Sequence, residues 1–200
     1  MNNKDKIRSN YEIKQRKKAF LEVTNLFKKN HIDFFLYGGV LLGFHRDKNF
    51  IKWDWDVEIG MFEKDLDLNY EKILRILKFN NFLIISKNKD ELKIVFTKYS
   101  KPSITQFEIN GFVYDYINKN FIRKKLNIPS KFLRNLSQIK IFNQKYFTPS
   151  PRSDFLKYVY DDWKKKINTT KKEIYLSKKM LNDNNWKFYL KLRKIKRILF

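Results

Sequence analysis

The sequence predicts an α+β fold, a mixed β-sheet flanked by helices, with the helices on one side and an acidic cluster at the edge of the sheet. Apolar residues recur at helical spacing in two segments and at strand spacing in several others, and glycine and proline residues separate the two kinds. The chain has 200 residues, of which 42% are hydrophobic, so it can bury one sizeable core.

The first expected helix spans residues 13–29, because Phe20, Val23 and Phe27 share one face. His31 stands at its end, where a capping or helix-dipole role fits. The next expected elements are a strand (34–37), a helix (40–46), a strand (57–61), a helix (67–80) and four strands (82–86, 92–97, 104–109 and 112–117). Asn110-Gly111, between the last two strands, is typical of a tight hairpin turn.

Gly38 and Gly39 lie between the short strand 34–37 and the helix 40–46. A strand, a glycine turn and a helix start make an anion site, because free amides and the positive helix end favour phosphate. Glycine also lets a ligand approach the backbone closely. Taken alone, two adjacent glycines are more typical of an ordinary turn than of an anion site.

An acidic cluster follows this turn. Asp54, Asp56 and Glu58 recur at every second residue, so a strand would point their side chains to one face. The residues that alternate with them are expected on the opposite face: Trp53, Trp55, Val57 and Ile59. Carboxylates about 4 Å apart repel by roughly 4 kcal/mol at a protein-surface dielectric, which favours a bound cation. Hard oxygen ligands suit Mg²⁺ or Mn²⁺ bridging to substrate phosphates.

The acids also have a plain structural interpretation, since charges on an exposed strand face can simply be solvated. The glycine turn and the acids nevertheless follow one another in the order that a phosphoryl-transfer site requires. The combination therefore favours a catalytic site.

Two segments, residues 35–46 (FLYGGVLLGFHR) and 50–61 (FIKWDWDVEIGM), resemble the signature of the LicD/fukutin family. That signature is a hydrophobic-Gly-Gly/Ser turn, then Asp-hydrophobic-Asp/Glu-hydrophobic on the next strand. Residues 112–117 (FVYDYI) are similar to the family's later strand carrying a third acid, and residues 146–163 to its late proline, helix and Tyr-Gly-Asp-Trp segment. The resemblance covers residues 15–166. The departures from the family pattern are at Val40, Lys52, Glu58 and Asp161.

The resemblance implies a nucleotidyltransferase-like fold, with residues 1–166 as the catalytic domain and residues 167–200 as a basic helical tail. It also implies an enzyme that depends on Mg²⁺ or Mn²⁺. The implied reaction moves a phosphate-bearing group, such as phosphocholine or a polyol phosphate, from a CDP-activated donor to a hydroxyl of a cell-surface glycan, such as lipopolysaccharide or teichoic acid.

The implied catalytic and metal-binding residues are Asp56, Glu58 and Asp115. The implied cofactor-binding residues are Gly38, Gly39, Arg46 and Asp54, with Asp54 placed behind the metal ligands rather than on the metal. Asp115 would complete the metal site or take the proton from the acceptor hydroxyl, while Arg46 would pair with donor phosphate through its planar fork. Arg46 equally fits a solvated helix end, and Asp115 fits an acid that ends an apolar strand. His45, next to Arg46, fits a helix-surface residue.

The composition excludes some classes of protein. The absence of cysteine excludes a disulfide framework and thiolate metal sites, and fits a reducing compartment. No stretch approaches the roughly 20 apolar residues of a membrane span, so a cytoplasmic location is expected, with peripheral attachment at the inner membrane face as an option. The net charge of +23 indicates an anionic partner, either nucleic acid or lipid, although the basic residues are spread along the whole chain.

The end of the chain has two features of its own. Ser153 or Asp154 is expected to cap a helix that runs to Trp163. Residues 186–200 describe a basic amphipathic helix, which either binds an anionic membrane or packs on the domain. Its apolar residues at helical spacing are Phe188, Leu192, Ile195 and Leu199. The surrounding basic residues are Lys187, Lys191, Arg193, Lys194, Lys196 and Arg197.

Two other functions remain compatible with the sequence. One is a nucleotidyltransferase that acts on RNA or a small molecule, which the positive charge would help. The other is a non-enzymatic basic protein that binds nucleic acid or membrane. The tryptophan-flanked acids favour the glycan-directed transferase, for which nucleic acid is the less expected partner.

Overall fold

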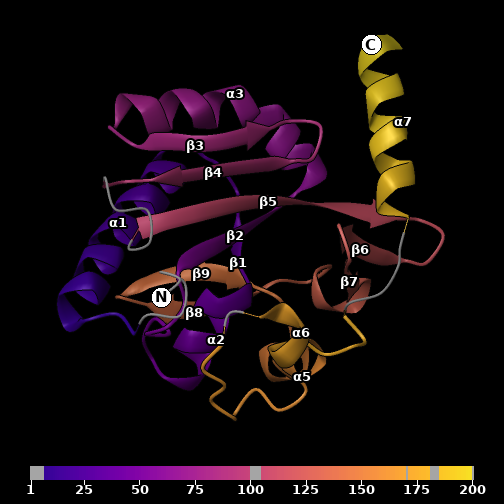
Figure 1. Cartoon of the computed structure of the whole chain (residues 1–200). Coiled ribbons are helices and arrows are strands. Elements are labelled where there is room, and N and C mark those ends of the chain that lie inside the picture. Colours follow the sequence, from indigo (N-terminus) through magenta and orange to yellow (C-terminus); the bar gives the residue numbers. More distant parts are fainter. Residues whose placement is uncertain (1–6, 100–104, 170, 181–184, 200) are drawn as a thin grey trace.

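The computed structural model describes residues 7–99, 105–169, 171–180 and 185–199 (Figure 1). The helices are α1 (Asn10–Lys29), α2 (Gly38–Arg46), α3 (Glu63–Phe79), the 3-10 helix η1 (Ser130–Phe132), α5 (Arg152–Tyr160), α6 (Lys172–Tyr175) and α7 (Trp186–Leu199). The strands are β1 (Phe35–Leu36), β2 (Asp56–Phe62), β3 (Leu83–Asn88), β4 (Lys93–Thr97), β5 (Gln106–Asp115), β6 (Asn120–Arg123), β7 (Leu126–Pro129), β8 (Ser137–Ile141) and β9 (Gln144–Thr148). Ile104, the expected start of a strand, and Phe200, the expected end of the tail, lie outside the described residues.

The predicted α+β class with a mixed sheet is confirmed. The strand order is β3-β4-β5-β2-β1-β9-β8, with β6 and β7 continuing from the far end of β5. β2 runs parallel to β5 and antiparallel to β1, while β1 runs parallel to β9. β2 is thus an inner strand, and its acids stand at the start of an inner strand rather than on an edge strand.

Hydrophobic cores lie on both faces of the sheet, since successive strand residues point to opposite faces. Leu36 packs in the larger core, with α1, α3 and the inward-facing Val57 and Ile59. Its neighbour Phe35 packs in the smaller core, with Phe155 of α5. The helices therefore cover both faces of the sheet, not one side as the sequence suggested.

The expected hairpin turn at Asn110-Gly111 is wrong, because both residues lie inside the single strand β5. A Cβ on Gly111 would stand 2.6 Å from the Cβ of Leu92, so glycine is needed there for close packing of the chain. The side chain of Asn110 is buried in the core, where its amide donates a hydrogen bond to the hydroxyl of Tyr37 at 2.9 Å. Asn110 and Gly111 thus belong to a central strand, β5, which pairs with β2 on one side and β4 on the other.

Helix ends agree with the sequence in one case and differ in another. His31 adopts a φ of +52° after α1, and its amide donates to the Lys28 carbonyl at 3.1 Å, so it closes the helix as expected through its backbone. The cap expected from Ser153 or Asp154 is not made, since α5 begins after Pro151 without a side-chain cap.

Among the described helices, none combines the length and the apolar character that crossing a bilayer requires.

Candidate active site

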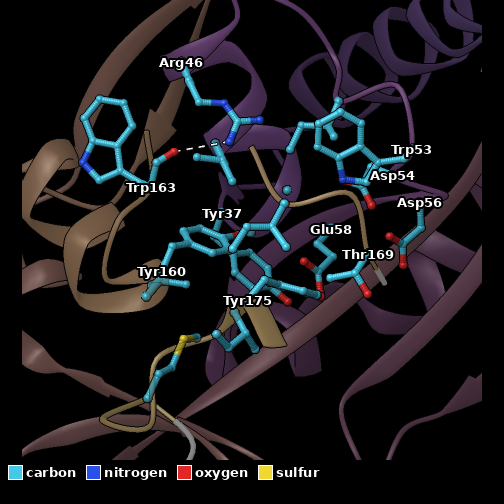
Figure 2. A pocket seen from close by; sticks show the side chains of 18 of the residues that line it. Tyr37, Arg46, Trp53, Asp54, Asp56, Glu58, Tyr160, Trp163, Thr169 and Tyr175 are labelled. Carbon is cyan, nitrogen blue, oxygen red and sulfur yellow. Dashed lines mark hydrogen bonds between the residues drawn. The ribbon is translucent and has the colours of Figure 1, made fainter. Parts of the chain in front are cut away.

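A pocket of about 250 Å³ opens where the start of β2 meets the start of α2 (Figure 2). The sheet side of the pocket consists of Tyr37, Gly38, Gly39, Asp56, Glu58, Lys93 and Glu108. The loop before β2 adds Ile51, Trp53, Asp54 and Trp55. The opposite wall comes from α5 and the segment after it, including Tyr160, Asp162, Trp163, Lys165, Ile167, Thr169, Tyr175 and Met180.

The sheet brings three carboxylates to this pocket. Asp56 and Glu58 are both partly exposed on β2, while Val57 between them is fully buried, as the alternation predicted. Glu108 of β5 is the direct register partner of Glu58 on the neighbouring parallel strand. Adjacent strands lie about 4.8 Å apart, so these two acids stand side by side. Lys93 of β4 forms an ion pair with Glu108 at 3.2 Å.

Asp115, expected as the third acid, does not lie in this pocket. Asp56 pairs with Gln106 at the start of β5, whereas Asp115 is the last residue of that strand. Its carboxylate accepts hydrogen bonds from the backbone amides of Ile117 and Asn118 at 3.0 and 3.1 Å and from the hydroxyl of Tyr189 at 3.3 Å. Asp115 therefore holds a turn and the helix α7.

Sequence reasoning missed Glu108, although a signal for it was present. The run Gln106-Phe107-Glu108-Ile109 repeats the alternation of polar and apolar residues in Asp56-Val57-Glu58-Ile59, with Glu108 at the position that matches Glu58. Phe107 and Ile109 are fully buried, which leaves Glu108 on the pocket side.

The glycine turn shapes the pocket by leaving room for carboxylates. Gly38 has a φ of +64°, which glycine adopts readily, and a Cβ there would stand 2.1 Å from Oε2 of Glu58. A Cβ on Gly39 would stand 2.0 Å from Oδ2 of Asp54. The acids thus lie directly against the start of α2, where the helix dipole favours negative charge.

Both tryptophans of the acidic motif lie in the pocket, so the expected opposite placement of Trp53 and Trp55 is wrong. The strand begins only at Asp56, and strand alternation does not extend into the loop before it. Figure 2 shows Trp53 beside Asp54. The tryptophans therefore give the pocket flat apolar surface next to its charges.

Two buried tyrosines near the acids, Tyr37 and Tyr160, have raised pKa values. Burial, reinforced by the negative charge of Glu58, raises the pKa of Tyr37 well above its ordinary value. Burial likewise raises the pKa of Tyr160 well above its ordinary value, with further contributions from Glu58, Tyr175 and Asp54. Both hydroxyls therefore stay protonated and can donate hydrogen bonds at neutral pH.

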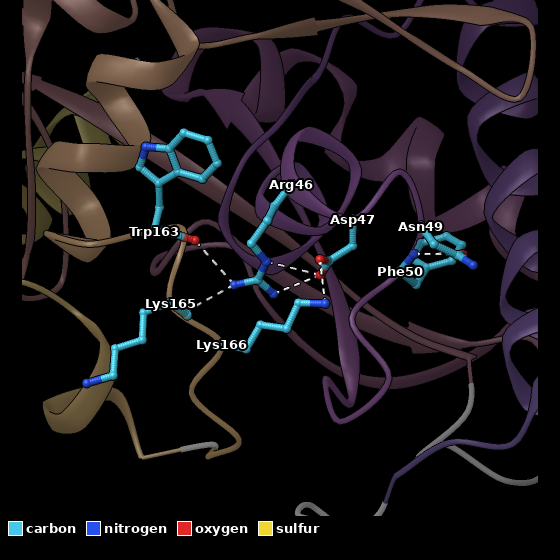
Figure 3. Close-up of polar contacts among 7 residues, drawn as sticks. All are labelled: Arg46, Asp47, Asn49, Phe50, Trp163, Lys165 and Lys166. Carbon is cyan, nitrogen blue, oxygen red and sulfur yellow. Dashed lines mark hydrogen bonds and ion pairs between the residues drawn. The ribbon is translucent and has the colours of Figure 1, made fainter.

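Arg46 lines the pocket but is held by protein contacts (Figure 3). Its Nε and Nη2 donate to Oδ2 of Asp47 at 3.1 and 2.9 Å. Its Nη1 donates to the carbonyl oxygens of Trp163 and Lys165, each at 3.3 Å. Lys166 completes the group with an ion pair to Asp47 at 3.0 Å. We call these contacts the Arg46 clasp, which ties the segment after α5 to the end of α2.

His45 lies beside the clasp, on the surface of α2. Its ring packs edge-on against Trp163 at 4.8 Å between centroids. Burial, together with the positive charges of Lys48 and Arg152, lowers its pKa. These contacts agree with the expected role as a helix-surface residue.

The expected division at residue 166 passes through the wall of the pocket. Ile167, Thr169, Tyr175 and Met180 belong to the expected tail, yet they line the same pocket as the acids. The lysine-rich composition of residues 164–179 suggested a linker, and the apolar residues within it build the wall instead. Within the described part of the expected tail, Lys172–Tyr175 (α6) and Trp186–Leu199 (α7) are helices.

The carboxylate oxygens that line the pocket are the kind of ligand that a hard cation such as Mg²⁺ prefers. In the part of the chain that the structure describes, no group of three or more His, Cys, Asp or Glu side chains is gathered closely enough to hold a metal ion. Mg²⁺ typically uses only one or two protein carboxylates and completes its shell with water and substrate phosphates. Asp56 and Glu58 fit that requirement, with carboxylate oxygens facing the pocket (Figure 2).

Comparisons with known proteins give a family and distant structural relatives. The family model described as LicD/FKTN/FKRP, nucleotidyltransferase domain, matches residues 31–152. A search of curated proteins finds no match. A crystal structure of the lincosamide antibiotic adenylyltransferase LnuA with lincomycin bound has a TM-score of 0.49 and 12% identity, covering 70% of this chain and 83% of that chain. The solution structure of the antibiotic-resistance factor ANT(2'')-Ia has a TM-score of 0.48 and 6% identity, covering 69% and 66%.

Proposed function

The chain belongs to the LicD/FKTN/FKRP nucleotidyltransferase-domain family, and on this premise we propose that it transfers a phosphate-bearing group from a CDP-activated donor to a glycan hydroxyl. Phosphocholine or a polyol phosphate is the proposed group, and a cell-surface glycan is the proposed acceptor. The observation that carries the proposal is the meeting of Asp56, Glu58 and Glu108 in one pocket at the start of α2.

In the proposed reaction, the acceptor oxygen forms a bond to the donor phosphorus, the bond from that phosphorus to CMP breaks, and the hydroxyl proton passes to a base. No protein nucleophile is needed, because positioning and electrostatic stabilisation dominate phosphoryl transfer. Mg²⁺ or Mn²⁺, held by Asp56 and Glu58, would supply charge neutralisation on the donor diphosphate.

The remaining pocket residues take roles that follow from their positions. Glu108, in place of Asp115, is the proposed base for the acceptor hydroxyl, and Lys93 beside it is the proposed cation for a donor phosphate. Trp55 is proposed to pack against the cytosine or sugar of the donor, because aromatic faces stack on both. Arg46 is proposed to act indirectly, by holding the pocket wall through its clasp.

Ligand-induced thermal stabilisation tests the proposal first. CDP, UDP, ADP and GDP are added with and without Mg²⁺ or Mn²⁺, since a ligand at 100 times its Kd stabilises by about 2.7 kcal/mol. We expect a metal-dependent preference for CDP, which Asp56→Asn removes. Equal responses to all four nucleotides would instead favour a transferase of broader nucleotide use, and no response in any condition would overturn the proposal.

Turnover of a CDP-activated donor provides the second test. We expect Asp56→Asn to abolish release of CMP without unfolding the protein, because the substitution removes one metal-binding charge from a partly exposed position. Two acids on β5 serve as a comparison, because Glu108 lines the pocket and Asp115 does not. Glu108→Gln should therefore lower turnover far more than Asp115→Asn. An active Asp56→Asn enzyme would contradict the assigned metal site.

A further inference from the structure

Helix α7 has one face anchored on the protein and one face turned outward. Figure 1 shows it standing at the end of β5, with its C-terminal end directed away from the sheet. The described side chains of this helix run from Trp186 to Ile195. Lys196, Arg197 and Leu199, which the sequence also assigned to the amphipathic pattern, have side chains outside the described part of the chain.

The anchored face is fixed by specific contacts. Arg193 is only 6% exposed and donates to both carboxylate oxygens of Asp67 on α3, at 2.8 and 2.9 Å, and also pairs with Glu63. The hydroxyl of Tyr189 donates to Asp115 at 3.3 Å and accepts from the amide of Tyr116 at 3.1 Å. A bidentate Arg–carboxylate pair fixes orientation as well as position. The rotation of α7 about its axis is therefore set by the protein.

The outer face carries an apolar stripe bordered by lysines. Phe188, Leu192 and Ile195 recur at helical spacing and are 51%, 37% and 52% exposed. The lysines that immediately precede them in the sequence, Lys187, Lys191 and Lys194, are exposed as well. We call these six residues the α7 outer face. The helix packs on the domain, which was one of the two options for residues 186–200, but it does so through the opposite face. The apolar stripe is left uncovered.

We propose that the α7 outer face docks the protein on an anionic lipid bilayer. An amphipathic helix lies in the plane of the membrane with its apolar residues about 5–10 Å deep and its lysines at the headgroups. Anionic lipid provides the charge that the lysines complement, and acyl chains provide the apolar surroundings that the stripe lacks. The proposal concerns attachment, and it stands independently of the proposed transfer reaction.

Other occupants fit the α7 outer face less well. Nucleic acid would use the lysines but leave Phe188, Leu192 and Ile195 in water. A second copy of this chain would bring another net charge of +23 against the same lysines, which opposes association. Bilayer lipid satisfies both components of the face at once.

Vesicle co-sedimentation of the full chain tests the proposal. The probes are vesicles of phosphatidylcholine alone and of phosphatidylcholine with phosphatidylglycerol. We expect binding to the anionic vesicles only. Replacing Lys187, Lys191 and Lys194 with Gln should weaken it on the order of 100-fold, because each lysine near the surface contributes about fivefold. Replacing Phe188, Leu192 and Ile195 with Ser should also weaken binding, even at low salt.

The matched control is Lys140→Gln, Lys145→Gln and Lys157→Gln, which removes equal charge from exposed positions on β8, β9 and α5. Its vesicle binding should remain close to that of wild type. Equal losses in the control and in the α7 lysine variant would overturn the proposal, since binding would then follow net charge alone. Unchanged binding in the Ser variant would do the same, and so would a Ser variant that loses only self-association or RNA binding.

Discussion

At the residue scale, the shape of the pocket depends on two missing side chains. Gly38 and Gly39 allow Glu58 and Asp54 to lie against the first turn of α2, where any Cβ would overlap their carboxylate oxygens. The two positions differ in backbone conformation, because only Gly38 has a positive φ. Comparing an alanine substitution at Gly38 with one at Gly39 therefore separates the effect of backbone strain from the effect of crowding.

We expect Gly38→Ala to cost about 1–2 kcal/mol of stability, the usual penalty for an L-residue in the left-handed region, and to lower turnover by displacing Glu58. Gly39→Ala should cost less, because its backbone is unstrained and the overlapping Asp54 carboxylate is the end of a side chain. Urea unfolding and CMP release measure the two effects. Equal stability losses in both variants would contradict the assignment of strain to Gly38.

The sequence located the first two acids because they alternate on a short strand directly after a glycine turn. It pointed to Asp115 as the third acid, which lies outside this pocket, because residue types alone do not reveal register. Asp115 ends an apolar strand, as the family pattern requires, but pairing of Asp56 with Gln106 brings Glu108 to the pocket. Only the parallel alignment of β2 and β5 distinguishes the two acids.

At the element scale, turn chemistry misled the strand assignments. Asn110-Gly111 lies within β5, whereas the real hairpins turn at residues without glycine. Lys124 between β6 and β7 has a φ of +51°, and Phe142 and Asn143 between β8 and β9 have φ values of +49° and +64°. Phe142 also packs against Phe44 at 5.1 Å, so core packing fixes a turn that local sequence preference would not predict.

The attachment of α7 should depend on pH through Asp115. Burial by itself raises the pKa of this carboxyl, but hydrogen bonds from Asn118, Ile117 and Tyr189 outweigh burial and lower the pKa from its ordinary value. A lowered pKa in the folded state stabilises the protein above the unfolded-state pKa, and this contribution is lost as pH falls through the folded-state pKa.

We therefore expect Asp115→Asn to reduce stability at pH 7 and to flatten the loss of stability as the pH falls below about 5, the range in which carboxyl groups begin to bind protons. Thermal unfolding across that range measures both effects. Asp161→Asn, which removes one charge from an exposed position after α5, is the control, and its stability at pH 7 should stay close to that of wild type. An Asp115→Asn protein with wild-type stability at pH 7 would contradict the anchoring role.

At the scale of the whole molecule, the excess of positive charge opposes the compact state. The chain has 44 basic and 21 acidic residues, so ion pairs such as Lys93–Glu108 and Arg193–Asp67 leave the net charge at +23. Repulsion among exposed lysines is screened by salt, whereas partly buried pairs are screened much less. Salt should therefore remove more repulsion than attraction.

We expect the Tm to rise when NaCl is increased from 0.1 M to 1 M, as the Debye length falls from about 10 Å to about 3 Å. A gain of 1 kcal/mol corresponds to about 2–4 °C for a chain of this size. Sucrose at equal osmolarity is the control for general solvent effects. A Tm that falls with salt would show that the ion pairs outweigh the repulsion.

The Arg46 clasp has a consequence for the order in which the protein is made. Its carbonyl partner in Trp163 lies 117 residues after Arg46 along the chain. At roughly 5–20 residues per second, a ribosome needs about 6–23 s to add that stretch. During this interval the acids of β2 face solvent without their opposite wall. The strands β2 and β5, which carry the acids, are therefore synthesised before the segment after α5 that encloses them, and the pocket closes only when that late segment has been added.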